Sequence, residues 1–335
     1  MPFFLRPHSA KLLQNFKDNF VRQHSSFPKK NTLPKDSAVK KAAEILEEFQ
    51  SHPANHHELF KYLEDLAKEG MTPEQYLVYR DNFFYRTSNT VLSVASHATH
   101  AVRNHDYQAF VAISRNFSDE SGNGNIEGIH LKLLEDGHNF HGKIVFGVPE
   151  MTIPNSKNSP FLTPEAINFR KVQERMFRSS YATMTGCLLA HEDAADEMLN
   201  NFKKYIFDPY KGYYTEPEFK KLTEYYTVHR DDSKENGNVE EQHKEQALRI
   251  ASEMIATKPR AEKLILEGGK KFLNIQSDLW NGLMREIENS KFHGPKVIPK
   301  SDFLSESKKP STSIKKNSAK KFVDNPNDKS NSNNI

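Results

Sequence analysis

The sequence of 335 residues contains a single cysteine, Cys187. A lone thiol excludes an internal disulfide and every zinc or redox motif that needs a CxxC pair. An excess of one charge is also lacking, because 47 lysines and arginines face 44 acidic residues, for a formal net charge of +3. This charge balance gives no argument for a nucleic-acid or membrane partner. The single cysteine favours a reducing cytoplasm.

Long apolar runs are missing as well. No stretch reaches the roughly 20 apolar residues that a membrane-spanning helix needs, and residues 1–20 lack the unbroken apolar centre of a signal peptide. Runs of short alternating strands are also absent, although residues 143–148 are compatible with one small extended piece. We therefore expect a soluble, all-α protein.

Helical periodicity dominates between the two ends of the chain. Helix starts with a threonine cap, a proline and an early glutamate occur at residues 72–75, 163–165 and 215–218. Further helices are expected over residues 38–50, 58–69, 106–117, 126–136, 164–207 and 240–287, the last with a break near Gly268-Gly269.

The apolar share of 36% suffices for one sizeable core. We expect a basic, partly disordered leader over residues 1–37 and a helical bundle over residues 38–290. Residues 291–335 should form a low-complexity, disordered tail, because lysine, serine, asparagine and aspartate soon dominate there and large apolar residues are scarce.

One segment places Glu120 and His130 on either side of Gly122 and Gly124. Each glycine inside a helix costs about 1 kcal/mol, which indicates a kink. On a straight helix, residues ten apart lie about 15 Å apart along the axis, so the two side chains can bind one metal ion only if the chain bends. Glu127, one turn before His130, is the local alternative to Glu120.

A second cluster contains His229, Glu240 and His243. Glu240 and His243 stand three residues apart, which allows both to bind one metal from a single helical turn. On an unbroken helix His229 would lie about 16 Å from this pair. The turn-forming residues within 231–237 favour a break there. Asp232, one turn after His229, is the alternative to Glu240.

Between these clusters, the small and apolar run GCLLAH at residues 186–191 ends at Glu192. A carboxylate at the end of such a run is expected to face the interior of the bundle, which makes Glu192 the candidate bridging ligand. Oxygen and imidazole ligands without thiolate suit iron or manganese, and iron suits dioxygen chemistry. Zinc is compatible with the same ligand types.

The order of these residues resembles that of the haem-oxygenase-like di-iron oxidases and oxygenases. Glu120 and His130 match the first two ligands of the N-x-x-x-E-x-G-x-G-x-x-x-x-x-H stretch, and Glu192 matches the third ligand. His229 and His243 match the histidines of the last signature, usually H-x-x-x-D-x-x-H. Here seven extra residues separate them, and a glutamate stands three residues before the second histidine.

The resemblance covers residues 73–287 and implies a haem-oxygenase-like bundle of about seven or eight helices. It implies two iron ions and dioxygen as co-substrate, with oxidation or oxygenation of a small organic substrate such as an amino acid, a fatty acid or an amine. An external electron donor and a homodimer are compatible with it. The implied iron ligands are Glu120, His130, Glu192, His229, Glu240 and His243.

Two alternatives stay open at this point. Glu127-x-x-His130 and Glu240-x-x-His243, together with Glu192, also resemble a ferritin-like four-helix site. Glu74 or Asp81 would supply the fourth carboxylate. A metal-free helical bundle that binds a partner protein is the other alternative. In such a bundle Cys187 is either a reactive thiol or plain packing.

Other polar residues have less specific settings. Lys171 and Arg175 either bind a substrate carboxylate or lie on a solvated face. Five histidines are expected at the surface or around the ligands: His97, His100, His138, His141 and His191.

Overall fold

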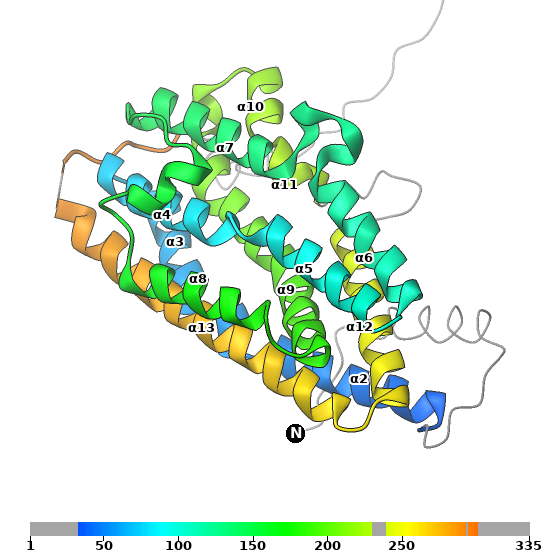
Figure 1. Ribbon diagram of the computed structural model, residues 1–335. Helices are drawn as coiled ribbons and strands as arrows, with labels where there is room; N and C mark the ends of the chain where they lie inside the picture. Colours follow the sequence, from blue (N-terminus) through cyan, green and yellow to red (C-terminus); the bar gives the residue numbers. More distant parts are fainter. Residues whose placement is uncertain (1–32, 230–238, 293, 301–335) are drawn as a thin grey trace, which may run out of the picture. The chain divides into compact units, whose positions relative to one another are not determined.

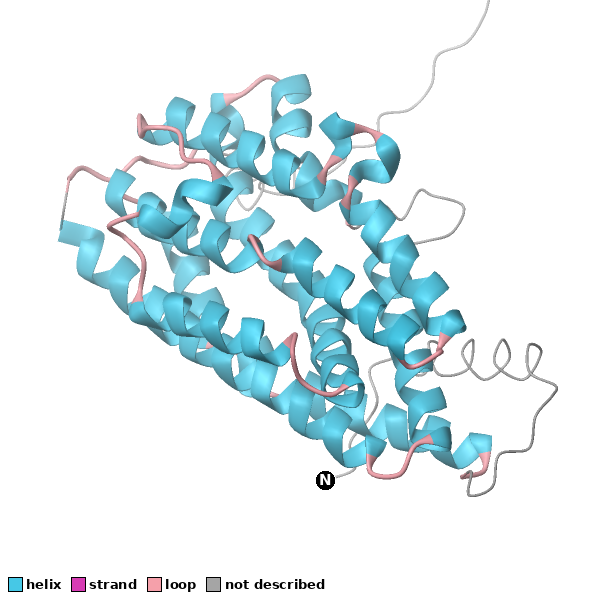
Figure 2. Ribbon diagram, in the orientation of Figure 1, coloured by secondary structure: helices cyan, strands magenta, loops and turns pink. Residues whose placement is uncertain are grey.

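The structure is a computed structural model that describes residues 33–229, 239–292 and 294–300. Within these ranges the chain forms twelve α-helices and no strand (Figure 2), so the all-α class predicted from the sequence is confirmed. The helices are α2 (Lys35–Gln50), α3 (Glu58–Glu69), α4 (Pro73–Thr87), α5 (Thr90–Arg103), α6 (Tyr107–Glu120), α7 (His130–His141), α8 (Pro164–Met176), α9 (Tyr181–Phe202), α10 (Glu216–Leu222), α11 (Glu224–Val228), α12 (Val239–Thr257) and α13 (Ala261–Asn289).

The described chain has more helices than the seven or eight expected. Helix α5 was not expected from the sequence, the stretch over residues 240–287 forms α12 and α13, and residues 164–207 are divided. Helix α8 ends at Met176, and α9 starts afresh with Ser180 as its cap, whose side chain accepts a hydrogen bond from the backbone nitrogen of Thr183. Residues 143–148, which the sequence left compatible with a small extended piece, do not form one. A π-helical turn, Gly142–Phe146, occupies most of this stretch and continues α7.

The break expected at Gly268-Gly269 is also wrong, since α13 runs through both glycines. A Cβ atom on Gly268 would meet the carbonyl oxygen of Thr183, so the glycine serves close packing of α13 against α9. The break lies earlier, between α12 and α13. Pro259 cannot continue a helix, and Arg260 has a left-handed φ of 65°.

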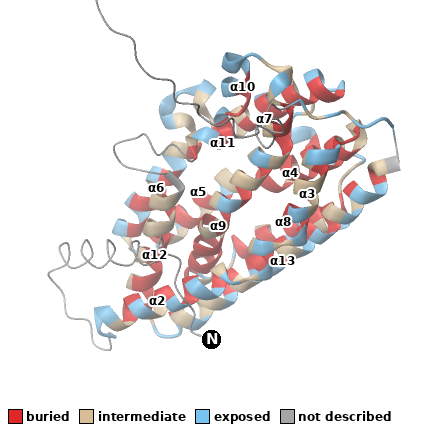
Figure 3. Ribbon diagram, turned by 180° about the vertical axis from the view of Figure 1, so that it is seen from behind, coloured by how far each residue is buried: buried red, intermediate tan, exposed pale blue. Residues whose placement is uncertain are grey.

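Helix α9 occupies the middle of the described bundle. It packs against α2, α5, α12 and α13 (Figure 1), and most of its residues are buried (Figure 3). This setting follows from its small and apolar sequence, which has no polar face wide enough to be solvated. A carboxylate on this helix, such as Glu192, is consequently placed inside the protein.

The bundle extends beyond residue 290, where the tail was expected to begin. The backbone nitrogen of Val297 donates to the carbonyl oxygen of Met71 at 2.8 Å, and that of Gly212 donates to the carbonyl of Lys300 at 2.6 Å. The other end starts slightly earlier than expected, with α2 at Lys35. Residues 1–32 and 301–335, which hold the rest of the leader and the tail, lie outside the described residues. None of the described helices is long and apolar enough to span a membrane.

Candidate metal centre

The end of α6 and the start of α7 form the first half of the candidate site. Helix α6 ends at Glu120, and α7 begins at His130. Between them, Gly122 and Gly124 adopt φ values of +75° and +85°, which L-residues rarely adopt. A Cβ atom on Gly122 would also lie 2.6 Å from the carbonyl carbon of Gly128. The predicted bend is therefore present, and it places Nδ1 of His130 3.3 Å from Oε2 of Glu120.

His229, directly after α11, joins this pair. Its Nε2 lies 3.9 Å from Oε1 of Glu120, and its ring centroid lies 4.4 Å from that of His130. Its Nδ1 lies 2.6 Å from the carbonyl oxygen of Tyr225. Because a carbonyl only accepts, Nδ1 donates this hydrogen bond, and Nε2 is the ring nitrogen that faces Glu120. Glu120, His130 and His229 form a buried cluster with ligand atoms within 4.8 Å of one another.

A second group lies beside the first and comes from three helices. Nδ1 of His243, on α12, lies 3.7 Å from Oε2 of Glu192 on α9. Nε2 of the same ring lies 3.3 Å from Oδ2 of Asp119 on α6. Asp119 was not singled out from the sequence, although its position directly before Glu120 was a usable signal. The break after His229 thus lets both histidines approach neighbouring acidic residues of α6.

One cavity has members of both groups in its wall. Its lining combines carboxylates and imidazoles with apolar side chains and one guanidinium: Arg86, Thr87, Thr90, Val94, Asn116, Glu120, His191, Glu192, Ala195, Met198, Leu199, Tyr225, His229 and His243. The cavity is small, with an accessible volume of about 20 Å³, so as it stands it has room for a water molecule or an ion.

The electrostatics of the first group suit a metal ion. Burial acts to raise the pKa of Glu120, but the adjacent imidazoles of His130 and His229 outweigh it and hold that pKa well below its usual range. The carboxylate is consequently ionised at neutral pH, as a metal ligand must be. Nδ1 of His130 is buried and makes no hydrogen bond with any described residue. The carboxylate and imidazole donor types of this cluster fit iron.

Asp119 in the second group is ionised for a similar reason. Burial acts to raise its pKa, whereas hydrogen bonds from His243 and Asn123 lower it, and the lowering prevails. Asp119 is therefore a further candidate ligand or a positioning partner of His243.

Three of the ligand residues considered from the sequence are not seen in either cluster of the candidate site. Glu127 is exposed over 70% of its side chain and lies 3.4 Å from Nζ of Lys132. Glu240 lies in α12 one turn before His243, but its side chain is outside the described residues, as is all of Asp232. The identity of the last carboxylate stays a prediction.

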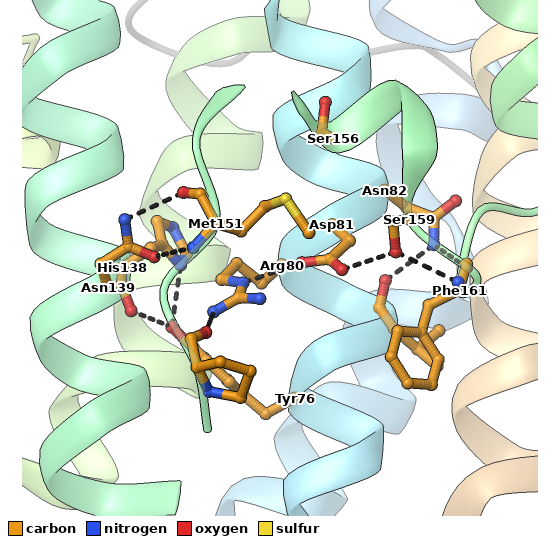
Figure 4. Close-up of polar contacts among 12 residues, drawn as sticks. Tyr76, Arg80, Asp81, Asn82, His138, Asn139, Met151, Ser156, Ser159 and Phe161 are labelled. Carbon is orange, nitrogen blue, oxygen red and sulfur yellow. Dashed lines mark hydrogen bonds and ion pairs between the residues drawn. The ribbon is translucent and has the colours of Figure 1, made fainter. Parts of the chain in front are cut away.

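The carboxylates required by the ferritin-like alternative lie elsewhere. Asp81 accepts a hydrogen bond from Nε of Arg80 at 2.8 Å and another from Ser159 at 2.6 Å, in a buried ion pair (Figure 4). Glu74 lies in the first turn of α4. Neither lines the cavity, so α4 offers no fourth carboxylate to a ferritin-like site.

Three histidines that were expected at the surface or around the ligands are instead buried. Each forms a hydrogen bond with a side chain outside the candidate ligand set. His97 bonds Thr185 at 3.0 Å, and His138 bonds the hydroxyl of Tyr226 at 2.8 Å. His141 bonds Tyr214 in the same way. Burial lowers the pKa of His97 and His141 to about 3, so both rings are neutral.

His191, by contrast, lines the cavity. The pKa of His191 is lowered to about 3, mainly by burial and to a smaller extent by the charge of Arg86. Lys171 and Arg175, the cations considered for a substrate carboxylate, are both exposed on α8 and do not line the cavity. The cation in its wall is Arg86, which no local sequence pattern marked.

No family model and no curated protein matches the chain. A CADD-like protein of unknown function from Nostoc punctiforme has a similar structure, with a TM-score of 0.55 and 14% identity over 76% of this chain and 98% of that chain. A TenA homologue from Pseudomonas syringae pv. tomato gives a TM-score of 0.54 and 15% identity, over 78% of this chain and 100% of that one. The chain shares their fold.

At these identities the likeness concerns the fold alone. It agrees with the all-α, haem-oxygenase-like bundle that the sequence resemblance implied. Membership of the di-iron oxidase family stays a prediction, and the chemistry has to be argued from the side chains of the site.

Proposed function

We propose that the chain is a non-haem di-iron enzyme that activates dioxygen to oxidise or oxygenate a small organic substrate of the amino-acid, fatty-acid or amine class. The observation that carries this proposal is the buried convergence of Glu120, His130 and His229. Glu192 and His243 lie in the wall of the same cavity. Buried carboxylates and imidazoles in this number are costly unless a cation compensates them.

Each side chain has a definite part in such a site. Glu120, His130 and His229 would hold one iron, and Glu192 and His243 would hold the second. Bound iron supplies the electrons with which dioxygen is reduced. The hydrogen bond from His229 to the carbonyl of Tyr225 fixes the ring orientation.

Apolar side chains supply the other part of the wall, among them Val94, Met198 and Leu199. They keep bulk water away from the ligands.

Iron counting on matched variants tests the proposal. The full chain is loaded with iron(II) under nitrogen, desalted and assayed for iron per folded chain. We expect close to two irons in the wild type, a clear loss in Glu120→Gln, and wild-type content in Glu127→Gln, because the Glu127 side chain points to solvent beside Lys132. A folded wild-type chain that takes up no iron would sink the proposal.

The same samples test dioxygen activation. After loading, the protein is mixed with aerated buffer and oxygen consumption is followed with an electrode. Wild type should consume oxygen faster than an equal amount of free iron(II) with Glu120→Gln. Equal rates would leave a metal-binding protein without the proposed activity. Iron loss in Glu127→Gln but not in Glu120→Gln would favour the ferritin-like alternative.

A further inference from the structure

Helix α6 has apolar residues on two opposite faces. Its inner face packs against α5 and α12 and buries Ala109, Ala112, Ile113, Asn116 and Glu120. On its outer face, four large apolar side chains are exposed, which we call the α6 stripe: Tyr107, Phe110, Val111 and Phe117. At 100° per residue, these four positions fall within an arc of about 120°. A surface helix normally carries polar residues on such an outer face.

The α6 stripe is continuous along the helix and uncharged. The two other positions in the same arc are Ser114 and Ser118, which are small and neutral. The helix lies at one side of the described bundle, where α5 and α12 are its neighbours (Figure 1). Single exposed apolar residues are common on protein surfaces, but a continuous patch of them marks an interaction surface. The α6 stripe therefore calls for a partner surface.

The leader joins the described bundle beside the start of this stripe. The backbone nitrogen of Leu33 donates to the carbonyl oxygen of Ala256 at 3.2 Å. Two residues later, Nζ of Lys258 donates to Oδ1 of Asn104 at 3.1 Å. Asn104 stands three residues before Tyr107, where the α6 stripe begins. Residues 1–32 consequently leave the bundle close to the first turn of α6.

The leader contains an apolar pattern that matches the α6 stripe. In helical conformation, residues 12–20 would place four large apolar side chains within an arc of about 100°: Leu12, Leu13, Phe16 and Phe20. The remaining positions of this segment are polar or charged. A helix this short is marginally stable alone in water, so its apolar face needs a surface to pack on. The segment and the α6 stripe have similar lengths, about 12 and 15 Å.

The connection between the two is long enough. Residues 21–33 can span up to about 40 Å, which exceeds the length of the α6 stripe. The other end of the chain fits less well. Residue Lys300 lies beside Gly212, at a 2.6 Å hydrogen bond, and the large apolar residues beyond it are few and widely spaced. Residues 301–335 thus offer no matching apolar face.

The size of the α6 stripe favours a segment of the same chain over a second copy. A strip one helix wide and about 15 Å long gives a contact area of roughly 150 Å². A stable interface between two proteins buries about 800 Å² on each partner. A segment tied to the bundle by a short linker has an effective concentration of about millimolar, so a small contact area suffices to dock it.

We propose that residues 12–20 of the leader dock as an amphipathic helix on the α6 stripe of the same chain, apolar face against apolar face. The docked segment stabilises the helix whose last turn contains Asp119 and Glu120. Docking requires neither iron nor an enzymatic activity, so the proposed function and this contact are tested separately.

Hydrogen exchange of backbone amides tests the contact in the full chain. In wild type, the amides of residues 13–20 should exchange about ten-fold or more slowly than in an unfolded chain, because a docked helix protects them. Val111→Asp places a charge in the middle of the α6 stripe, and Phe16→Asp places one in the middle of the leader face. Each should return these amides to the rates of an unfolded chain.

Ile144→Asp is the matched control. Ile144 is also β-branched and similarly exposed, at 45% against 54% for Val111, but it lies in the π-helical turn after α7. This substitution adds the same charge to an exposed apolar position away from α6. It should leave the protection of residues 13–20 unchanged.

Three results would overturn the docking. Unprotected amides at residues 13–20 in wild type would do so without any variant. Protection that survives in both folded Val111→Asp and folded Phe117→Asp would place the leader on another surface. Protection that disappears on hundred-fold dilution, together with a dimer mass in light scattering before dilution, would show that a second copy covers the α6 stripe.

Discussion

Nδ1 of His130 lies 3.3 Å from Oε2 of Glu120, although the two residues are ten positions apart in the sequence. A straight helix would hold them about 15 Å apart along its axis. The turn at Gly122 and Gly124 removes that separation by ending α6 and starting α7 at a new angle. The first half of the candidate metal centre therefore depends on backbone conformations that glycine adopts most readily.

This dependence predicts different effects for two glycine substitutions. Both glycines have positive φ, but a Cβ atom on Gly122 would lie 2.6 Å from Gly128, whereas one on Gly124 meets nothing within 4 Å. Gly122→Ala should lower the free energy of unfolding by about 2–4 kcal/mol and reduce iron uptake. Gly124→Ala should cost about 1 kcal/mol and keep the iron. Urea unfolding and iron assay measure both, and equal effects would contradict the role of Gly122.

Asp119 should govern iron affinity through His243. Asp119→Asn keeps the side-chain shape but removes the charge that faces Nε2 of His243 at 3.3 Å. We expect iron affinity to fall about 10–100-fold, the usual effect of losing a ligand or its orienting partner. Asp136→Asn is the control, since that aspartate is exposed and pairs with Lys132. Competition with a chelator measures the affinity, and wild-type affinity in Asp119→Asn would remove Asp119 from the site.

Asp81 should matter for stability and not for iron. Asp81→Ala leaves the buried guanidinium of Arg80 without its carboxylate, which should cost about 3–5 kcal/mol. Iron per folded chain should stay at the wild-type value, because Asp81 does not line the cavity. Asp65→Ala, which breaks an exposed ion pair with Lys61, should change the unfolding midpoint little. Loss of iron in folded Asp81→Ala would revive the ferritin-like alternative.

Cys187 should be unreactive in the folded chain. Burial raises the pKa of its thiol to about 12, so at about pH 8 it is protonated and shielded. A thiol reagent should modify it only after denaturant is added. Rapid labelling of the native protein would instead favour the metal-free alternative with a reactive cysteine.

The same shift predicts a dependence of stability on pH. Because the folded pKa lies above the unfolded value of about 9, the contribution of the protonated thiol is complete below about pH 9. It is lost as the pH rises towards 12. Between these values the urea midpoint of wild type should fall more steeply than that of Cys187→Ala. Parallel curves would show that the thiol does not contribute.

The sequence by itself determined much of the local structure. The threonine cap at Thr72 is present, with Gln75 completing a capping box, because such bonds join residues three apart. The bend at Gly122 and the interior setting of Glu192 also follow from neighbouring residues. Backbone preference and helical periodicity act over a few residues, and the sequence reports them directly.

Only the tertiary structure decided which helices meet. Glycines at 268 and 269 weaken a helix locally, yet they lie inside α13 because close packing on α9 and Phe49 requires them. Asp119 approaches His243, which lies 124 positions later in the chain. Arg86 lines the same cavity as His191 and His243, which are more than 100 positions away in the sequence. Periodicity indicates which face of a helix is buried, but it does not indicate which other helix packs on that face. The contacts between helices therefore follow only from the tertiary structure.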